Sequence, residues 1–121
     1  LRGILTIQGN EIWGNSAGPV HSAGGGVWIG GIHSLIADNR FGENTSADTG
    51  GGLWAGFEGS KFIISNVFVS NRSGDIGGGV FVDQGYAAVK GNRLYGNKAA
   101  RGPGIGAGTR GRKTIEDNIE S

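Results

Sequence analysis

The chain contains no cysteine and no methionine, and only two of its 121 residues are proline. Without cysteine it has no disulfide framework and no thiol chemistry, although this absence does not assign a compartment. No apolar run approaches the roughly 20 residues that a helix needs to cross a bilayer. The net charge is +1, which does not indicate a broad surface for polyanions. Only the C-terminal part is locally basic, with Arg101, Arg110, Arg112 and Lys113.

Long amphipathic stretches with helical spacing are also missing. Glycine accounts for 27 of the 121 residues, and no segment sustains apolar residues at an interval of about 3.6. This excludes the α-helix as the main element. Short apolar pieces separated by Gly, Asn, Asp and Ser have instead the length and the β-branched content of strands.

What the chain does have is an internal repeat. A segment of glycines followed by aliphatic or aromatic residues occurs at 24–29, 50–55 and 77–82, with a degraded copy at 102–107. Each copy precedes an aliphatic residue and an asparagine at nearly constant distance. The asparagines that mark the repeat are Asn10, Asn39, Asn66, Asn92 and Asn118, separated by 29, 27, 26 and 26 residues. Self-similarity at such a period predicts a solenoid.

Three short strands per period predict a parallel β-helix, in which successive coils lie about 4.8 Å apart and equivalent residues stack. One inward stack is expected from Ile7, Ile36, Ile63, Val89 and Ile115. A second is expected from Ile12, Phe41, Phe68 and Leu94, and a third from Val27, Leu53, Val80 and Ile105. The repeated asparagines are expected to form a structural ladder, because an amide both donates and accepts hydrogen bonds and tolerates a tight bend.

The repeats also carry Phe-x-x-Asn, at 41–44 and 68–71, after the glycine-rich segment. This pairing resembles the repeats of bacterial right-handed parallel β-helix proteins, including the polymorphic outer-membrane protein and autotransporter-passenger type. The resemblance covers essentially the whole chain. It implies a right-handed β-helix of about four coils with three short strands each, forming one domain over residues 1–121. It also implies an extracellular or cell-surface location, and is less specific for activity, because related β-helices include adhesins, filament components, polysaccharide lyases and glycoside hydrolases.

No cap is evident at either end of the predicted solenoid, where strand edges and apolar core would be open. The absence of caps has two expected explanations. Either the chain is an excerpt of a longer β-helix, or its ends self-associate with other copies. Residues 2–10 match residues 110–118, so the chain begins and ends at nearly the same point of the winding. Head-to-tail contacts of this kind do not close and give a filament.

One face of the predicted solenoid is a candidate binding surface. Trp28, Trp54 and Phe81 alternate with inward residues and are expected to form an exposed aromatic ladder. Such ladders stack sugar rings or dock proteins, although they also stabilise a sheet without any ligand. On another face, Glu11 and Arg40 are expected to form a cross-coil ion pair.

The search for catalytic chemistry gives no signature. Asp38 and Asp117 are equivalent but three coils apart, and Asp48 and Asp75 lie at roughly corresponding corners of adjacent coils, where two acids are weak evidence for a metal site. The Gly-x-Gly-x-x-Gly at 106–111 has no helix after it to bind a phosphate. We therefore predict no catalytic, metal or cofactor site, and a non-enzymatic structural or adhesive module. The alternative is a carbohydrate-binding or polysaccharide-degrading β-helix.

Overall fold

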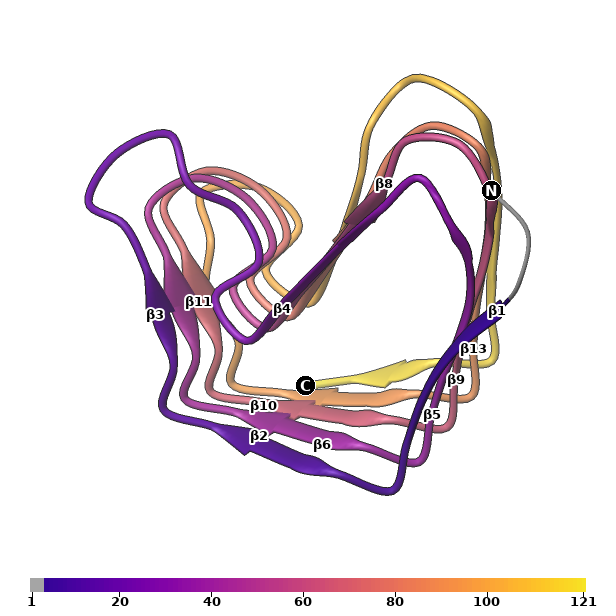
Figure 1. Ribbon diagram of the computed structural model, residues 1–121. Helices are drawn as coiled ribbons and strands as arrows, with labels where there is room; N and C mark the ends of the chain where they lie inside the picture. The colour runs from indigo at the N-terminus through magenta and orange to yellow at the C-terminus, as the bar shows by residue number, and fades with distance from the viewer. Residues whose placement is uncertain (1–3) are drawn as a thin grey trace.

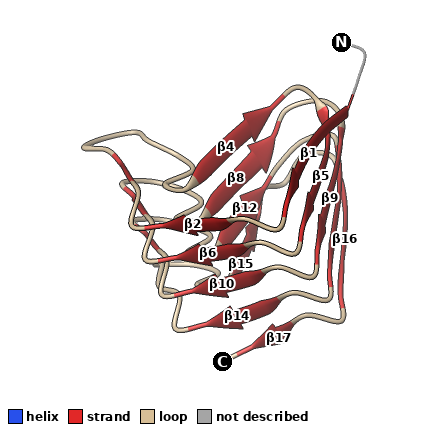
Figure 2. Ribbon diagram, turned by 60° about the horizontal axis from the view of Figure 1, so that its bottom comes forward, coloured by secondary structure: helices blue, strands red, loops and turns tan. Residues whose placement is uncertain are grey.

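The computed structural model of the chain describes residues 4–121, which form seventeen strands and no helix. The strands wind into a parallel β-solenoid of about four turns (Figure 1). Every strand pairing is parallel, and the strands of each sheet come from successive coils (Figure 2). The all-β solenoid that the repeat predicts is therefore confirmed. The part of the single-domain prediction that falls on residues 1–3 lies outside the described residues.

Two sheets have five strands each. Sheet I contains β1 (Ile4–Gln8), β5 (His33–Ala37), β9 (Ser60–Ile64), β13 (Tyr86–Lys90) and β16 (Arg112–Glu116). Sheet II contains β2 (Glu11–Trp13), β6 (Arg40–Gly42), β10 (Val67–Val69), β14 (Arg93–Tyr95) and β17 (Ile119–Glu120). The repeated asparagines lie at the corner between these two sheets.

The remaining two sheets are smaller. Sheet III contains β3 (Ser16–Ala17), β7 (Thr45–Ser46) and β11 (Arg72–Ser73), and sheet IV contains the glycine-rich strands β4 (Val27–Gly30), β8 (Leu53–Gly56), β12 (Val80–Val82) and β15 (Ile105–Ala107). The sequence predicts three strands per coil, whereas each of the first three coils has four. Sheet III is missed because a strand of two residues is too short to show an alternating pattern.

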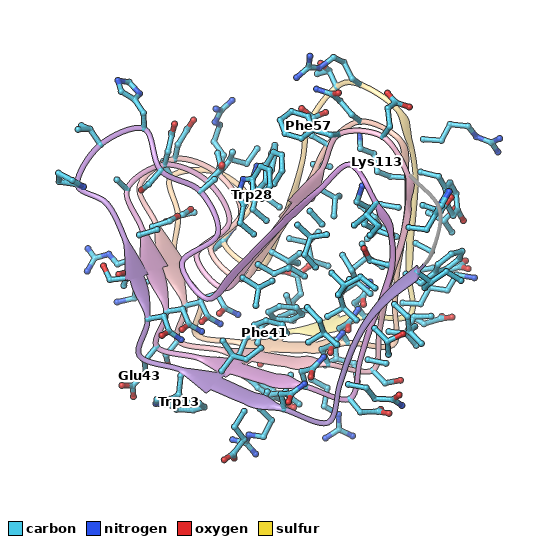
Figure 3. All side chains as sticks on the ribbon, viewed as in Figure 1. Trp13, Trp28, Phe41, Glu43, Phe57 and Lys113 are labelled. Atoms are coloured by element: carbon cyan, nitrogen blue, oxygen red, sulfur yellow. The ribbon has the colours of Figure 1, made fainter. Side chains whose placement is uncertain are left out.

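The core follows the predicted stacks. Ile7, Ile36, Ile63, Val89 and Ile115 are consecutive partners in the register of sheet I. The middle three are fully buried. In sheet II, the rings of Phe41 and Phe68 stack with centroids 4.8 Å apart and an interplanar angle of 9°. Phe41 points into the interior, whereas Trp13 of the same sheet and Glu43, which follows β6, point outward (Figure 3). Burial of these columns supplies the main apolar contribution to stability.

The asparagines join the coils along the axis. The Nδ2 of Asn66 donates to Asn92 Oδ1 at 3.1 Å and to the carbonyl of Ile36 at 2.8 Å. Its Oδ1 accepts from both the backbone N and the Nδ2 of Asn39, each at 3.0 Å. The left-handed backbone that turns the corner belongs to the preceding residue, such as Ser65 with φ 58°, and not to the asparagine as expected. The asparagine is thus free to use its amide for stacking.

A second ladder runs along the corner between sheets II and III. It consists of Asn15, Asn44, Asn71 and Asn97, bonded in the same way. Asn44 and Asn71 also begin formal Asn-x-Ser glycosylation sequences, but both are completely buried and their amides are fully engaged. In the folded chain these two side chains serve the ladder.

Candidate binding surfaces

The aromatic residues of sheet IV stack on its outer face. Trp28 pairs in register with Trp54, and Trp54 with Phe81. The two indole rings are 4.9 Å apart and inclined by only 3°, and Trp54 and Phe81 are 6.5 Å apart at 24°. Phe57, from the corner after β8, meets both indoles edge-on at 5.7 and 5.2 Å. Trp28 lies outside the solenoid with Phe57 farther along the same face (Figure 3).

Exposure falls steeply along this stack. Trp28 is 51% exposed, Trp54 is half-buried and Phe81 is only 8% exposed. The expectation that Phe81 is exposed is therefore wrong. Its partner in the next coil is Gly106, so no aromatic side chain continues the stack there, and Ile76, which precedes β12, packs beside Gly106. Because Trp54 lies between two aromatic neighbours, a ligand ring has good access only to Trp28.

Two glycines without a Cβ leave the space that the indole rings occupy. A Cβ at Gly30 would lie 2.5 Å from Cη2 of Trp28 and 2.7 Å from Cδ2 of Phe57. A Cβ at Gly56 would lie 2.5 Å from Cη2 of Trp54. Each ring therefore occupies space above the glycine two residues ahead of it. This Trp-x-Gly spacing is the sequence signal for a fixed indole, and it leaves Trp28 both exposed and oriented.

Sheet I has an apolar outer face that the sequence reasoning missed. Phe62 is 41% exposed and lies edge-on to Tyr86, with ring centroids 6.0 Å apart. Together with Ile4, Leu35 and Ile64 it lines a hollow of about 560 Å³. Alternation could have found this face, because an inward Ile63 requires Phe62 to point outward.

The outer face of sheet II differs from its expected arrangement. Glu11 and Arg40 are partners in register. The guanidinium of Arg40, however, lies 5.9 Å from the ring centroid of Trp13, and no Glu11–Arg40 ion pair occurs among residues 4–121. Trp13 itself lies over Gly42 of the next coil. Because Gly42 has no side chain, the indole of Trp13 can lie flat on the sheet. There its ring attracts the guanidinium of Arg40.

The acidic side chains do not converge. Asp75 is engaged by Arg101, whose Nη2 donates to both carboxylate oxygens at 2.9 and 3.1 Å. Asp38 and Asp117 occupy left-handed positions at corners of different coils. Within residues 4–121, no group of three or more His, Cys, Asp or Glu side chains is arranged to hold a metal ion. The sequence 106–111 leads from β15 into strand β16.

Two lysines point into the solenoid near the corner between sheets IV and I. Lys61 is 1% exposed, and its Nζ donates to the carbonyl of Glu58 at 2.6 Å. Burial lowers the pKa of Lys61, and the charge of Glu58 partly opposes this. Lys113 donates to the carbonyls of Gly108 and Arg110, and lies on the interior side of the corner (Figure 3). Both lysines therefore satisfy carbonyl groups of corner loops.

No protein-family model, no curated protein and no solved structure matches the chain. The described residues also contain no helix long and apolar enough to cross a membrane.

Proposed function

We propose that the chain is a non-enzymatic structural and adhesive module of an extracellular or cell-surface β-helix, whose edges pair with further coils. The direction of the asparagine ladders carries this proposal. Every ladder amide that has a counterpart in the following coil donates to it, as Asn39 does to Asn66 and Asn92 does to Asn118. The ladder is thus polar, and each coil offers the next one the same set of donors and acceptors.

The two outermost coils leave complementary groups unused. Among the described residues, Asn10 Oδ1 accepts no hydrogen bond and the backbone N–H of Asn118 finds no acceptor. Within residues 4–121, strands β1 and β16 are each paired on one side only, with β5 and β13. Unpaired parallel edges of this kind bind further strands. The repeat resemblance to right-handed bacterial β-helices supports placing such a module at the cell surface.

In this proposal, a second copy of the chain supplies the further coils. A copy stacked head-to-tail would pair β16 with the next β1, and β17 with the next β2. Sheets I and II have five strands whereas sheet IV has four. In this stacking, β15 therefore has no strand of the second copy directly next to it, and a gap one strand wide remains in sheet IV. Although the chain begins and ends at nearly the same point of the winding, two stacked copies therefore do not pair in all four sheets. We expect end-on contacts between copies to be weaker than contacts between coils within one chain.

Sedimentation velocity and negative-stain electron microscopy test this proposal on the purified chain. We expect rods whose length grows with protein concentration. Lysine substitutions at the edges, Ile4→Lys on β1 and Ile119→Lys on β17, should suppress growth, because a charge disfavours edge pairing. Val20→Lys is the matched control, since Val20 is similarly exposed but lies in the loop between β3 and β4. A monomer that persists at high concentration, or equal suppression by Val20→Lys, contradicts end-on pairing.

Carbohydrate binding is the second candidate, favoured by the exposed and fixed ring of Trp28. An indole held in place stacks on a sugar ring with little loss of side-chain entropy. Glycan-array binding of the chain and of Trp28→Ala tests this candidate, with Trp13→Ala as a control for loss of an exposed tryptophan. An assay for released sugars on anionic polysaccharides separates binding from degradation.

A further inference from the structure

The outer corner between sheets IV and I contains a hollow of about 400 Å³, formed by the last three coils. The corner loops that form it comprise residues 57–59, 83–85 and 108–111, so the last is one residue longer. This last loop extends farther outward than the corners of the earlier coils (Figure 1). The side chains that line the hollow are Glu58, Gln84, Tyr86, Arg110 and Arg112. Its volume lies within the range of small-molecule sites, about 300–1,000 Å³.

Arg110 is held in place from behind by a largely buried carboxylate. The side chain of Asp83 is 13% exposed, and its Oδ2 accepts from Arg110 Nη2 at 3.1 Å. Asp83 Oδ1 also accepts from the backbone N–H groups of Gln84 at 2.9 Å and Arg110 at 3.3 Å. With its carbonyl oxygen turned to Arg110, Gln84 accepts from Nη1 and Nη2 at 3.0 and 2.9 Å. This network orients the guanidinium before any ligand arrives, which reduces the entropy lost on binding.

The other lining groups remain available. Arg112 makes no side-chain hydrogen bond or ion pair with any residue of 4–121. Tyr86 is fixed by its hydroxyl, which bonds to Thr114 Oγ1 at 3.1 Å, and by its edge-on contact with Phe62. Glu58 contributes a carboxylate to the rim, since only its backbone carbonyl is engaged by Lys61. The hollow thus combines two guanidinium groups, a fixed aromatic ring and one acceptor.

Charge is distributed unevenly along the solenoid. Residues 4–60 contain five acidic and one basic side chain, whereas residues 61–121 contain five acidic and nine basic side chains. The hollow lies mainly among the basic coils, because Gln84, Tyr86, Arg110 and Arg112 all belong to the second set. The long-range field therefore favours an approaching anion at this corner, although the whole chain is nearly neutral.

We propose that this corner hollow binds a carboxylated sugar. Guanidinium groups recognise planar carboxylates with paired hydrogen bonds, which assigns Arg112 to the acid group. Arg110, whose Nη2 already donates to Asp83, contributes its remaining N–H groups. Tyr86 offers an aromatic surface to the sugar ring. Glu58 accepts from a sugar hydroxyl and repels a more highly charged anion such as sulfate. This site is additional to the proposed structural function and does not depend on it.

Titration of the uniformly ¹⁵N-labelled chain with glucuronate, glucose and inorganic sulfate tests the proposal by NMR. We expect glucuronate to shift the amide signals of Gly85 and Gly111, and to bind more tightly than either other probe. Arg112→Gln should weaken glucuronate binding roughly tenfold, the loss expected for a hydrogen-bonded charge pair. Arg93→Gln is the matched control, because Arg93 is an exposed arginine of the same basic half on sheet II.

Several results would overturn this assignment. Glucuronate that leaves Gly85 and Gly111 unshifted shows that the hollow does not bind it. Equal weakening by Arg93→Gln shows that only diffuse charge attracts the anion. Sulfate binding as tightly as glucuronate shows a simple anion site, and equal binding of glucose removes the role of the carboxylate. Glu58→Gln sharpens the distinction, since it should strengthen sulfate binding and weaken glucuronate binding. Unchanged amide spectra of the free variants establish that each remains folded.

Discussion

The corner between sheets I and II and the corner between sheets IV and I differ in how strictly they repeat. The first carries asparagine in every coil, from Asn10 to Asn118, and each amide bonds to the next. The second changes in every coil, with Phe57 in one, Gln84 in the next and a longer loop at 108–111. Identical residues at one corner build the axis of the solenoid. Varied residues at the other build local surfaces, including the aromatic stack and the basic hollow.

This comparison separates scaffold from site within a single coil. A repeated asparagine satisfies buried polar groups in the coil before it and in the coil after it. Its replacement therefore affects three coils, including its own. A residue of the variable corner has individual contacts, and its replacement should act locally. The following substitutions measure that difference, beginning with the largest expected effect.

Asn66→Ala should be the most damaging change. It removes four hydrogen bonds in the buried ladder, which leaves the backbone N–H of Asn39 without its acceptor and takes one donor each from Asn92 Oδ1 and the carbonyl of Ile36. We expect the free energy of unfolding to fall by about 3–5 kcal/mol. Asn10→Ala, in the exposed first coil, removes two side-chain bonds and should cost about 1 kcal/mol. Urea denaturation measures both, and equal losses would show that the ladder is not cooperative along the axis.

Trp54→Ala should have the next largest effect. Trp54 contacts Trp28, Phe57 and Phe81, so its loss opens the middle of the stack. We expect destabilisation of about 3 kcal/mol for Trp54→Ala and about 1 kcal/mol for Trp28→Ala, which is half exposed and ends the stack. Thermal unfolding followed by circular dichroism compares the two. A larger loss for Trp28→Ala would contradict the order of burial.

The buried Lys61 should make stability depend on pH. Its pKa in the folded chain is lowered from 10.5 by burial, so the unfolded chain holds the proton more strongly. Between the lowered pKa and 10.5 the unfolded state binds more protons, and the free energy of unfolding therefore rises with pH. Lys61→Met should remove this rise while filling similar space. Denaturation midpoints measured from pH 7 to 10.5 test it, and an unchanged pH slope would show that Lys61 is not desolvated.

The smallest effect is expected at the exposed pair of Lys90 and Glu116, whose atoms Nζ and Oε1 are 3.0 Å apart. The hydrogen bond to Glu116 raises the pKa of Lys90, so any stabilisation is present below pH 10.5 and is lost above it. Salt screens exposed pairs, and Lys90→Gln should therefore change the urea midpoint little at pH 7. A loss as large as that of Trp54→Ala would show that charge pairs, rather than stacking, join these coils.

Sequence reasoning succeeds where the residue type recurs. The inward column of Ile36, Ile63 and Val89 follows from the repeat alone, because only stacked coils bury the same position each time. Sequence reasoning fails where the burial of a side chain depends on residues that lie next to it only in the folded chain. Alternation gives the outward direction of the Phe81 side chain but not its exposed fraction, which is only 8%.

The basic hollow illustrates the same limit. The sequence shows that Arg110 and Arg112 lie close together, but their relation to Gln84 and Tyr86 follows from the stacking of two corners of unequal length. Likewise, Lys61 precedes Phe62, and hydrophobicity alone would place the phenylalanine inside. Alternation from Ile63 reverses that choice, because positions 61 and 63 face the same side of the strand.

The most direct test of the stacking is a methyl NOESY experiment on the chain with labelled Ile, Leu and Val methyl groups. Strong cross-peaks are expected between Ile36 and Ile63 and between Ile63 and Val89, which are register partners in adjacent coils. No direct cross-peak is expected between Ile7 and Val89, which are three coils apart, or about 14 Å. Absence of the first two contacts, or a strong contact between Ile7 and Val89, would contradict the solenoid.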